Sequence, residues 1–319
     1  MDKNPLKRIE LARVAESQSP HPIHKVGALL CTLSSPGQYQ EHQYYNYWPD
    51  SLTKPIESGT KLGNASTTVH AEISALIQAK ASTNMADIYV TDLPCPNCAK
   101  TLAEAGINNV YIDSATHDTP LGIKMKPYFE DISLLMFERA GIGIYEVDLP
   151  TRSIATLSAP HSRENELVFA EAHYQNISET SRALFREQIA ALDYDDERPF
   201  AACIADDSTG NSFLVSGSAH NAMGLSTTEA EKIDQKQDKY EPVLQPFNRL
   251  LGQCAYYNLK IRNGYFFASF CPTAREFVNM IGYGLTSITI ENPEQCRDKW
   301  GLIALKQIHD HNVMKISEG

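Results

Sequence analysis

Residues 87–112, DIYVTDLPCPNCAKTLAEAGINNVYI, contain the features that decide the fold. The run at residues 87–91 predicts a buried strand, and a second run at residues 109–112 predicts another. Between them, Pro96 stands where a first-turn proline is tolerated in a helix, and Gly106 stands where a left-handed glycine ends one. The stretch therefore predicts a strand–helix–strand unit, which is typical of α/β proteins.

The same alternation extends over residues 1–148, so we expect an α/β sandwich there. The irregular segment between Tyr47 and Val69 is predicted to cover a pocket, because long connections of this kind are commonly functional. The predicted helices lie near 4–17, 70–81, 96–105 and 128–140, and the predicted strands near 25–33, 41–46, 87–91, 109–112 and 143–147.

The C-terminal half repeats this pattern at low identity. After a linker at residues 149–164, helices near 165–192 lead into a second block that extends to residue 319. Its strand FAACIADD corresponds to VGALLCTL of the first block, and its Asn221 falls where Asn46 falls. We interpret the chain as two tandem copies of one fold, the alternative being two unrelated α/β domains.

Three side chains of metal-ligand type lie at predicted helix N-termini in the first block. His70 opens one helix in the sequence His-Ala-Glu, and Cys95 and Cys98 open the next in Pro-Cys-Pro-Asn-Cys. One imidazole and two thiolates match the ligand number of a catalytic zinc site, which keeps its fourth position for water. Glu72 need not bind the metal in order to act on that water. The alternatives are a structural zinc or a redox-active Cys pair, but no fourth Cys or His accompanies these three residues.

The pattern H-x-E followed by P-C-x-x-C resembles the cytidine/deoxycytidylate deaminase superfamily, in the branch whose first zinc ligand is histidine. Residues 89–112 resemble deoxycytidylate deaminases almost throughout. The resemblance implies a cytidine deaminase-like three-layer α/β/α sandwich, and one zinc ion per chain, bound by His70, Cys95 and Cys98. It also implies that zinc-bound hydroxide attacks the amino-bearing carbon of a base, with Glu72 as the proton shuttle.

The same resemblance suggests which residues contact the substrate. Asn46 resembles the family's substrate-contacting asparagine, with a turn asparagine as the alternative. Gly27 and Ala28 match small residues of the family's first strand, where the backbone can approach the base. Trp48 is placed either to stack on a base or to pack within its loop. The expected substrate-binding residues are Asn46, Gly27, Ala28, Ala71 and Trp48.

The predicted second domain, residues 165–319, lacks a complete zinc site. Placing the two copies on one another sets Glu241-Pro242-Val243 against the His-Ala-Glu motif and Cys271-Pro272-Thr273-Ala274 against Cys-Pro-Asn-Cys, so one ligand cysteine is kept. An intact copy beside a decayed one resembles tandem cytidine deaminases and the accessory subunit of eukaryotic tRNA adenosine deaminase. We therefore expect an internal pseudo-dimer, whose second copy is a structural partner or, alternatively, a regulatory nucleotide site. A homo-oligomer of the chain is a further possibility.

Composition narrows the class of function. The chain has 319 residues and a net charge of −11, without a basic stripe that would bind a polynucleotide. It has no apolar stretch of membrane-spanning length, and five of its seven cysteines are scattered as in reduced cytosolic proteins, so we expect a cytoplasmic protein without membrane contact.

The leading hypothesis is hydrolytic deamination of cytosine to uracil in a small nucleotide or nucleoside, such as dCMP or cytidine. One alternative is a deaminase that acts on a base in tRNA or RNA, or on a purine such as guanine. A second alternative is a non-enzymatic, nucleotide-binding pseudo-deaminase, which the joint presence of Glu72 and all three ligand types disfavours.

Overall fold

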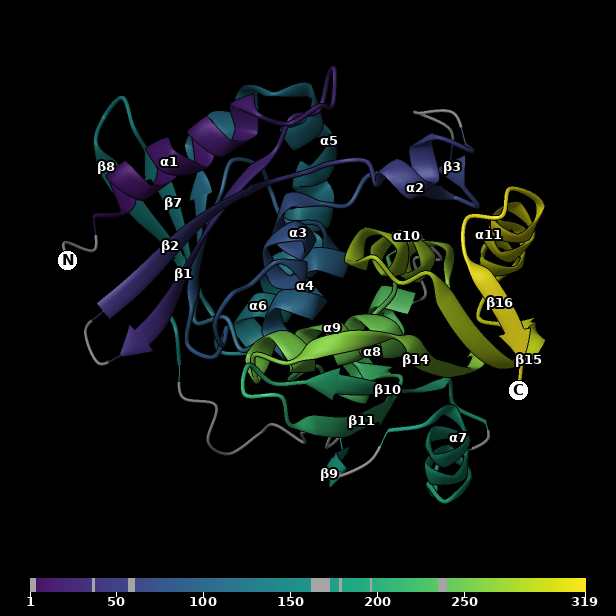
Figure 1. Ribbon diagram of the computed structural model, residues 1–319. Coiled ribbons are helices and arrows are strands. Elements are labelled where there is room, and N and C mark those ends of the chain that lie inside the picture. The colour runs from purple at the N-terminus through teal and green to yellow at the C-terminus, as the bar shows by residue number, and fades with distance from the viewer. Residues whose placement is uncertain are drawn as a thin grey trace.

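The computed structural model describes residues 4–35, 38–56, 61–161, 173–177, 180–195, 197–234 and 240–319. Two six-stranded sheets form the frame of the molecule, and helices cover both faces of each sheet (Figure 1). The expected mixed α/β architecture is confirmed. We refer to residues 4–161 as the first half and to residues 173–319 as the second half. No helix in the described ranges is both long enough and apolar enough to cross a membrane.

The first sheet has the strand order β2-β1-β5-β6-β7-β8. Strand β1 is antiparallel to both of its neighbours, while β5, β6 and β7 run parallel to one another. The strands are β1 (Gly27–Ser35), β2 (Gln38–Tyr45), β5 (Asp87–Val90), β6 (Asn109–Asp113), β7 (Gly143–Asp148) and β8 (Ser153–Ser158). One face of the sheet carries α1 (Pro5–Ser17), and the other carries α3 (Ala71–Ile77), α4 (Pro96–Glu104) and α6 (Leu134–Arg139).

Two stretches differ from the sequence-based prediction. Residues 153–158, which we assigned to the linker, form β8 and pair with β7, so the first sheet extends past its predicted end. Strand β8 is almost entirely exposed, and its Ser, Thr and Ala residues give no apolar alternation by which a strand is recognised. Among the described residues of the range 165–192, where we predicted helices, β9 (His173–Ile177) is a strand and α7 (Arg182–Ala190) is a helix. Residues 165–172 lie outside the described residues.

The second sheet repeats the order of the first for five of its six strands. Its order is β16-β15-β14-β10-β11-β9. In both sheets a hairpin is followed in space by an antiparallel strand, and then by two strands parallel to that one. These strands are β10 (Phe200–Asp206), β11 (Ser212–Ser218), β14 (Lys260–Cys271), β15 (Ser287–Cys296) and β16 (Lys315–Glu318). The shared order supports the interpretation as two tandem copies.

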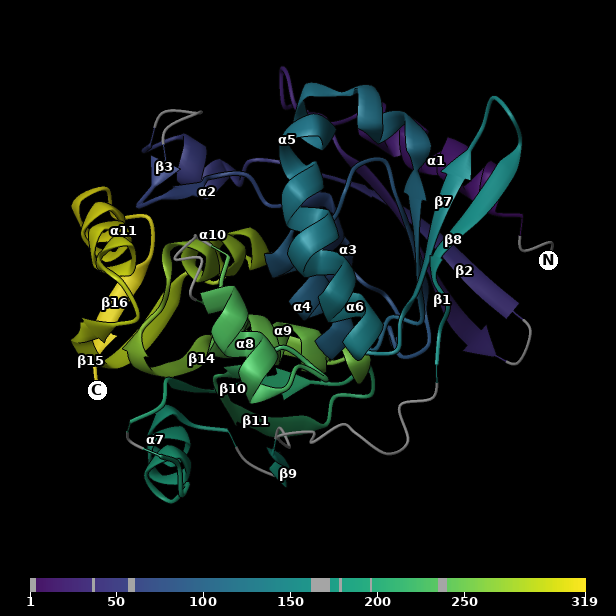
Figure 2. The same cartoon turned by 180° about the vertical axis from the view of Figure 1, so that it is seen from behind.

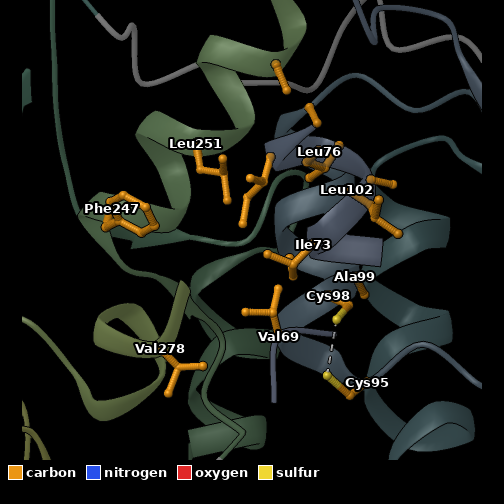
Figure 3. Packing of buried hydrophobic residues seen from close by; sticks show 14 of the residues in the cluster. Val69, Ile73, Leu76, Cys95, Cys98, Ala99, Leu102, Phe247, Leu251 and Val278 are labelled. Atoms are coloured by element: carbon orange, nitrogen blue, oxygen red, sulfur yellow. Dashed lines mark hydrogen bonds between the residues drawn. The ribbon is translucent and has the colours of Figure 1, made fainter. Parts of the chain in front are cut away.

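The helices of the second half are arranged like those of the first. Helix α7 lies on the outer face of the sheet, as Figure 2 shows from behind. The inner face carries α9 (Pro246–Tyr256), α10 (Ala274–Tyr283) and α11 (Lys299–Asp310). The two halves pack through their inner helices, because α4 contacts α9 and α3 contacts both α9 and α10. Figure 3 shows Leu251 of α9 opposite Ile73 and Leu76 of α3, within one hydrophobic cluster that spans both halves.

A buried ion pair crosses this interface. A carboxylate oxygen of Glu104 on α4 lies 3.4 Å from Arg249 Nε on α9, and it accepts a hydrogen bond of 2.6 Å from Gln253. Both charged side chains are almost completely buried. A second pair across the interface is more exposed: Arg139 of α6 lies 2.7 Å from Glu229 of α8 (Thr227–Asp234).

We predict that Glu104→Ala lowers the free energy of unfolding by about 3 kcal/mol or more, because it leaves the Arg249 guanidinium buried without its carboxylate. The matched control is Glu229→Ala, which removes the carboxylate of the exposed pair and should cost about 1 kcal/mol or less. Urea denaturation followed by circular dichroism measures both values. Equal losses of unfolding free energy in the two variants would show that the buried pair stabilises the interface no more than the exposed pair does.

Candidate active site

His70, Cys95 and Cys98 come together where α3 and α4 begin. His70 Nδ1 lies 3.5 Å from Cys95 Sγ and 3.3 Å from Cys98 Sγ, and the two sulfur atoms, joined by the dashed line in Figure 3, are 3.6 Å apart. In a tetrahedral zinc site with bonds of about 2.0–2.3 Å, ligand atoms are separated by roughly 3.4–3.8 Å. The three donors therefore fit one zinc ion and leave one coordination position open. Within the described ranges, no other group of three His, Cys, Asp or Glu side chains has this geometry.

Both helices begin at one of these residues. His70 is the N-cap of α3, and Cys95 is the N-cap of α4, with Pro96 in the first turn as predicted. The unpaired N–H groups and the dipole at a helix N-terminus favour a thiolate over a thiol. The predicted end of α4 at Gly106 is also confirmed, since that glycine has a positive φ of 72°.

A cavity of about 240 Å³ lies beside the three ligands. Glu72, the second residue of α3, lines it and is only 4 % exposed. Burial raises the pKa of the Glu72 carboxyl to about 7. The carboxyl thus stands next to the ligand group and faces the space that a small molecule would occupy, where it can accept or donate a proton.

Asn46 lines the cavity, but most of its amide is used within the protein. Its Oδ1 accepts hydrogen bonds from the Val26 backbone N–H at 2.8 Å and from Ser19 Oγ at 2.7 Å. Its Nδ2 donates to the His24 carbonyl at 2.8 Å. An amide of this type offers two N–H donors, and this bond uses one of them. Asn46 therefore holds the segment before β1 in place.

Among the other expected substrate contacts, Ala71 lines the cavity and Gly27 and Ala28 do not. A Cβ at Gly27 would lie 2.0 Å from the carbonyl oxygen of Ala12 in α1, so this glycine permits the close packing of α1 on β1. Ala28 is completely buried in the core. The small residues at the start of β1 are thus explained by packing on both faces of the strand.

Trp48 also lies outside the lining of the cavity. Its ring packs on His21, with 4.9 Å between the ring centroids, and His21 itself lines the cavity. The tryptophan therefore supports a cavity residue, which agrees with the packing alternative.

The segment between Tyr47 and Val69 lies between the two halves. The Tyr47 hydroxyl donates to the Gly282 carbonyl of α10 at 2.9 Å, and the Gly63 N–H donates to Gln307 of α11 at 2.7 Å. Its described parts include α2 (Asp50–Thr53), β3 (Lys61–Leu62) and β4 (Ala65–Ser66), and the residues that line the cavity are Asn64, Ala65, Ser66 and Thr68. Residues 57–60 lie outside the described ranges. The segment thus forms one wall of the cavity, in agreement with its predicted role.

Sequence reasoning missed several residues that line the cavity. Asp92 accepts hydrogen bonds of 2.7 Å from Thr116 Oγ1 and from the Leu93 N–H, and burial raises the pKa of its carboxyl. Its position two residues after the end of β5 was a signal for a site residue. Lys124 lies on α5 (Pro120–Tyr128), a helix that our prediction did not include.

Two further lining residues, Tyr240 and Arg275, belong to the second half. They are at least 142 residues away in sequence from the ligands of the first half, and no local motif connects the two sets. Only the packing of α10 against α3 and β4 brings them to the cavity.

The structure corrects our placement of the two copies on one another. Gln245 is the N-cap of α9 as His70 is of α3, and Thr273 is the N-cap of α10 as Cys95 is of α4. The prediction that Cys271 keeps the place of a ligand is therefore wrong, because Cys271 precedes the helix cap by two residues. The alignment followed the Cys-Pro dipeptide, whereas the helix caps define the structural register.

Two other positions change with this register. Glu241-Pro242-Val243 lies four residues before the position of the His-Ala-Glu motif, which Gln245-Pro246-Phe247 occupies. Asn221 is not the counterpart of Asn46: the N–H of Ala219 donates to the Pro199 carbonyl just before β10, as that of Asn46 donates to Val26 just before β1.

A carboxylate occupies the place of a zinc ligand in the second half. Glu276, in the position of Cys98, accepts hydrogen bonds from the backbone N–H of Phe247 at 2.8 Å and of Thr273 at 2.9 Å. These bonds join the N-termini of α9 and α10. The cavity there measures only about 20 Å³. The corresponding position therefore has neither the ligands for zinc nor the space for a nucleotide.

Comparison with known proteins agrees with this geometry. A family model described as the cytidine and deoxycytidylate deaminase zinc-binding region matches residues 6–114. An uncharacterized deaminase in the luxG 3′ region of Aliivibrio fischeri is 29% identical over 140 residues, which cover 42% of this chain and 87% of that protein. The deoxycytidylate deaminase of enterobacteria phage T2 is 35% identical over 100 residues, which cover 30% of this chain and 47% of that protein.

Among solved structures, the apo dCMP deaminase of the cyanophage S-TIM5 has 19% sequence identity and a TM-score of 0.33, and the match covers 46% of this chain and 100% of that one. The segment that the family model matches contains His70, Cys95 and Cys98, the three side chains that meet with zinc-site distances. On the matched segment and this ligand geometry together, residues 6–114 of the chain contain the zinc-binding region of the cytidine and deoxycytidylate deaminases.

Proposed function

We propose that the chain catalyses the hydrolytic deamination of cytosine to uracil in a small nucleotide or nucleoside. The observation that carries the proposal is the buried Glu72 carboxyl, which lines a cavity of about 240 Å³ beside the three zinc ligands. This volume is near the lower end of small-molecule pockets, about 300 Å³. Residues of both halves line the cavity. Its size supports a single nucleotide unit as the ligand.

In this proposal His70, Cys95 and Cys98 hold the zinc ion. When bound, zinc supplies the Lewis acidity that makes a water molecule nucleophilic near neutral pH. Glu72 accepts one proton from the attacking water and passes it to the ring nitrogen beside the amino-bearing carbon. The water oxygen forms the new bond to that carbon. Glu72 then transfers the second proton of the water to the amino group, the C–N bond breaks, and ammonia leaves behind a carbonyl.

We predict one zinc ion per chain and its loss in Cys98→Ser, because the remaining His70 and Cys95 cannot complete a three-ligand site. The matched control is Cys271→Ser, which alters a cysteine of the second half and should keep the zinc content near one. Metal analysis of protein purified without added zinc measures both. Two tightly bound zinc ions per chain would contradict the described ligand set.

Replacing Glu72 with Gln is expected to keep the zinc content and to lower kcat by about 10²- to 10⁴-fold, the usual contribution of a general acid–base group. Glu146→Gln serves as the control, because that carboxylate pairs with His117 outside the cavity and its loss should leave the rate unchanged. Ammonia release and metal analysis are measured on the same preparations. Loss of zinc from Glu72→Gln would make Glu72 a ligand and would refute the shuttle.

A third prediction concerns the size of the substrate. Turnover of cytidine, deoxycytidine and their monophosphates should change little between about 50 and 200 mM salt, whereas a protein with six or more phosphate contacts loses roughly 10³-fold in affinity. The net charge of −11 gives no field that attracts a long polyanion. Ammonia release from these compounds, from guanine and from a tRNA pool is measured side by side. Activity confined to tRNA with a steep salt dependence would overturn the proposal, as would activity confined to guanine.

A further inference from the structure

Arg275 brings a cationic group from the second half into the cavity of the first. It is the second residue of α10, and its Nη1 donates a hydrogen bond of 2.9 Å to the carbonyl of Thr68, two residues before the zinc ligand His70. Arg275 lines the same cavity as Glu72. A guanidinium has five N–H donors, and the bond to the Thr68 carbonyl uses one of them.

No carboxylate within the described ranges forms an ion pair with Arg275. The groups that favour its charged form electrostatically are the sulfur atoms of Cys95 and Cys98 and the hydroxyl of Tyr240. A guanidinium is always charged, and charges away from bulk water are normally paired. Arg275 therefore has capacity for an anion that enters the cavity.

A lysine of the first half makes a comparable contact with a carbonyl of the second half, but it does not line the large cavity. Lys100 of α4 crosses the interface and donates to the carbonyls of Val243 at 2.7 Å and Glu241 at 2.9 Å. Val243 lies two residues before the helix cap Gln245, as Thr68 lies two residues before His70. Lys100 is almost completely buried beside a cavity of only about 40 Å³. Each half thus supports the other's helix-capping segment with a cation, but only Arg275 does so at the edge of a large cavity.

A second cation lines the cavity from the first half. Lys124 on α5 is exposed, and no ion pair of the described part of the chain includes it. Its neighbour Lys126 lies outside the cavity lining and pairs with Glu130 at 3.8 Å. Arg275 and Lys124 together place positive charge on the cavity wall, whereas Glu72 lies next to the metal ligands.

We propose that Arg275 binds the phosphate of the substrate, so that the second half completes the active site and the preferred substrate is a nucleoside monophosphate. The inference rests on the proposed deamination, which places the base at the zinc ligands. The planar guanidinium fork suits two phosphate oxygens, and Lys124 adds a point charge. Arg275 is then a substrate-binding residue that determines specificity.

The test compares dCMP with deoxycytidine, which differ only in the phosphate. In Arg275→Gln, kcat/KM for dCMP should fall by about 10- to 100-fold, the range of one charge-assisted hydrogen bond, while the value for deoxycytidine changes less than about threefold. Arg275→Lys should restore part of the loss, because it keeps the charge without the fork. Lys126→Ala is the control and should leave both substrates unaffected.

A merely structural role gives a different result. If Arg275 only fixes the Thr68 carbonyl, Arg275→Gln lowers kcat/KM for dCMP and deoxycytidine by the same factor, and the proposal is overturned. Unchanged turnover of dCMP overturns it as well. Zinc content and the midpoint of thermal unfolding are measured for each variant, so that a folding defect is recognised by a fall in both. If Arg275→Gln has a folding defect, kcat/KM for dCMP and for deoxycytidine is compared in Arg275→Lys instead.

A binding experiment separates this proposal from the proposed function. Ribose 5-phosphate carries the phosphate without a base, and its affinity is measured by titration calorimetry on the wild-type chain and on Arg275→Gln. We expect binding that weakens by about 10-fold or more in the variant. Failure of the wild type to deaminate any cytosine compound refutes the proposed function alone. Absence of binding to the wild type, or equal binding by both proteins, refutes the role of Arg275.

Discussion

The close contact between α4 and α9 is the interaction on which the rest of the molecule depends. A Cβ at Gly252 of α9 would lie 2.9 Å from Cβ of Glu104, so the two helices approach as closely as they do because this residue has no side chain. The approach excludes water from the Glu104–Arg249 pair and joins the apolar residues of both halves into one cluster. Helix α10 packs against both α9 and α3, and its Arg275 forms part of the wall of the cavity beside the zinc ligands.

Both halves meet the same physical requirement where two inner helices begin. The first N–H groups of a helix have no partner within it, and a negative group near the N-terminus is favoured. In the first half, the Cys95 and Cys98 sulfur atoms stand at this place together with His70. In the second half, the carboxylate of Glu276 takes it and accepts two backbone hydrogen bonds. The two halves therefore place different groups at these helix N-termini. The first half has the metal ligands there, and the second half has a carboxylate in a closed structural junction.

The sequence predicted features that depend on local spacing. The zinc ligands, the start of α4 at Pro96 and its end at Gly106 follow from short motifs whose geometry is set within one or two helical turns. Strand β8 was missed because it is an exposed edge and has no apolar period. The register of the second half was misplaced because the Cys-Pro dipeptide recurs two residues away from the helix cap. Arg275 and Tyr240 reach the cavity only through tertiary packing, which no local pattern encodes.

Joining two copies in one chain permits a difference between them that a symmetric dimer does not. In a dimer of identical subunits, each substitution at the interface occurs at both sites. In this chain, Lys100 and Arg275 contact equivalent carbonyls from opposite sides, yet one is buried against a closed junction and the other borders an open cavity. At the position of the first half's metal ligands, the second half has hydrogen bonds that keep α10 in place. These hydrogen bonds provide a rigid base for Arg275, because the capping box formed by Thr273 and Glu276 fixes the helix turn on which the arginine stands.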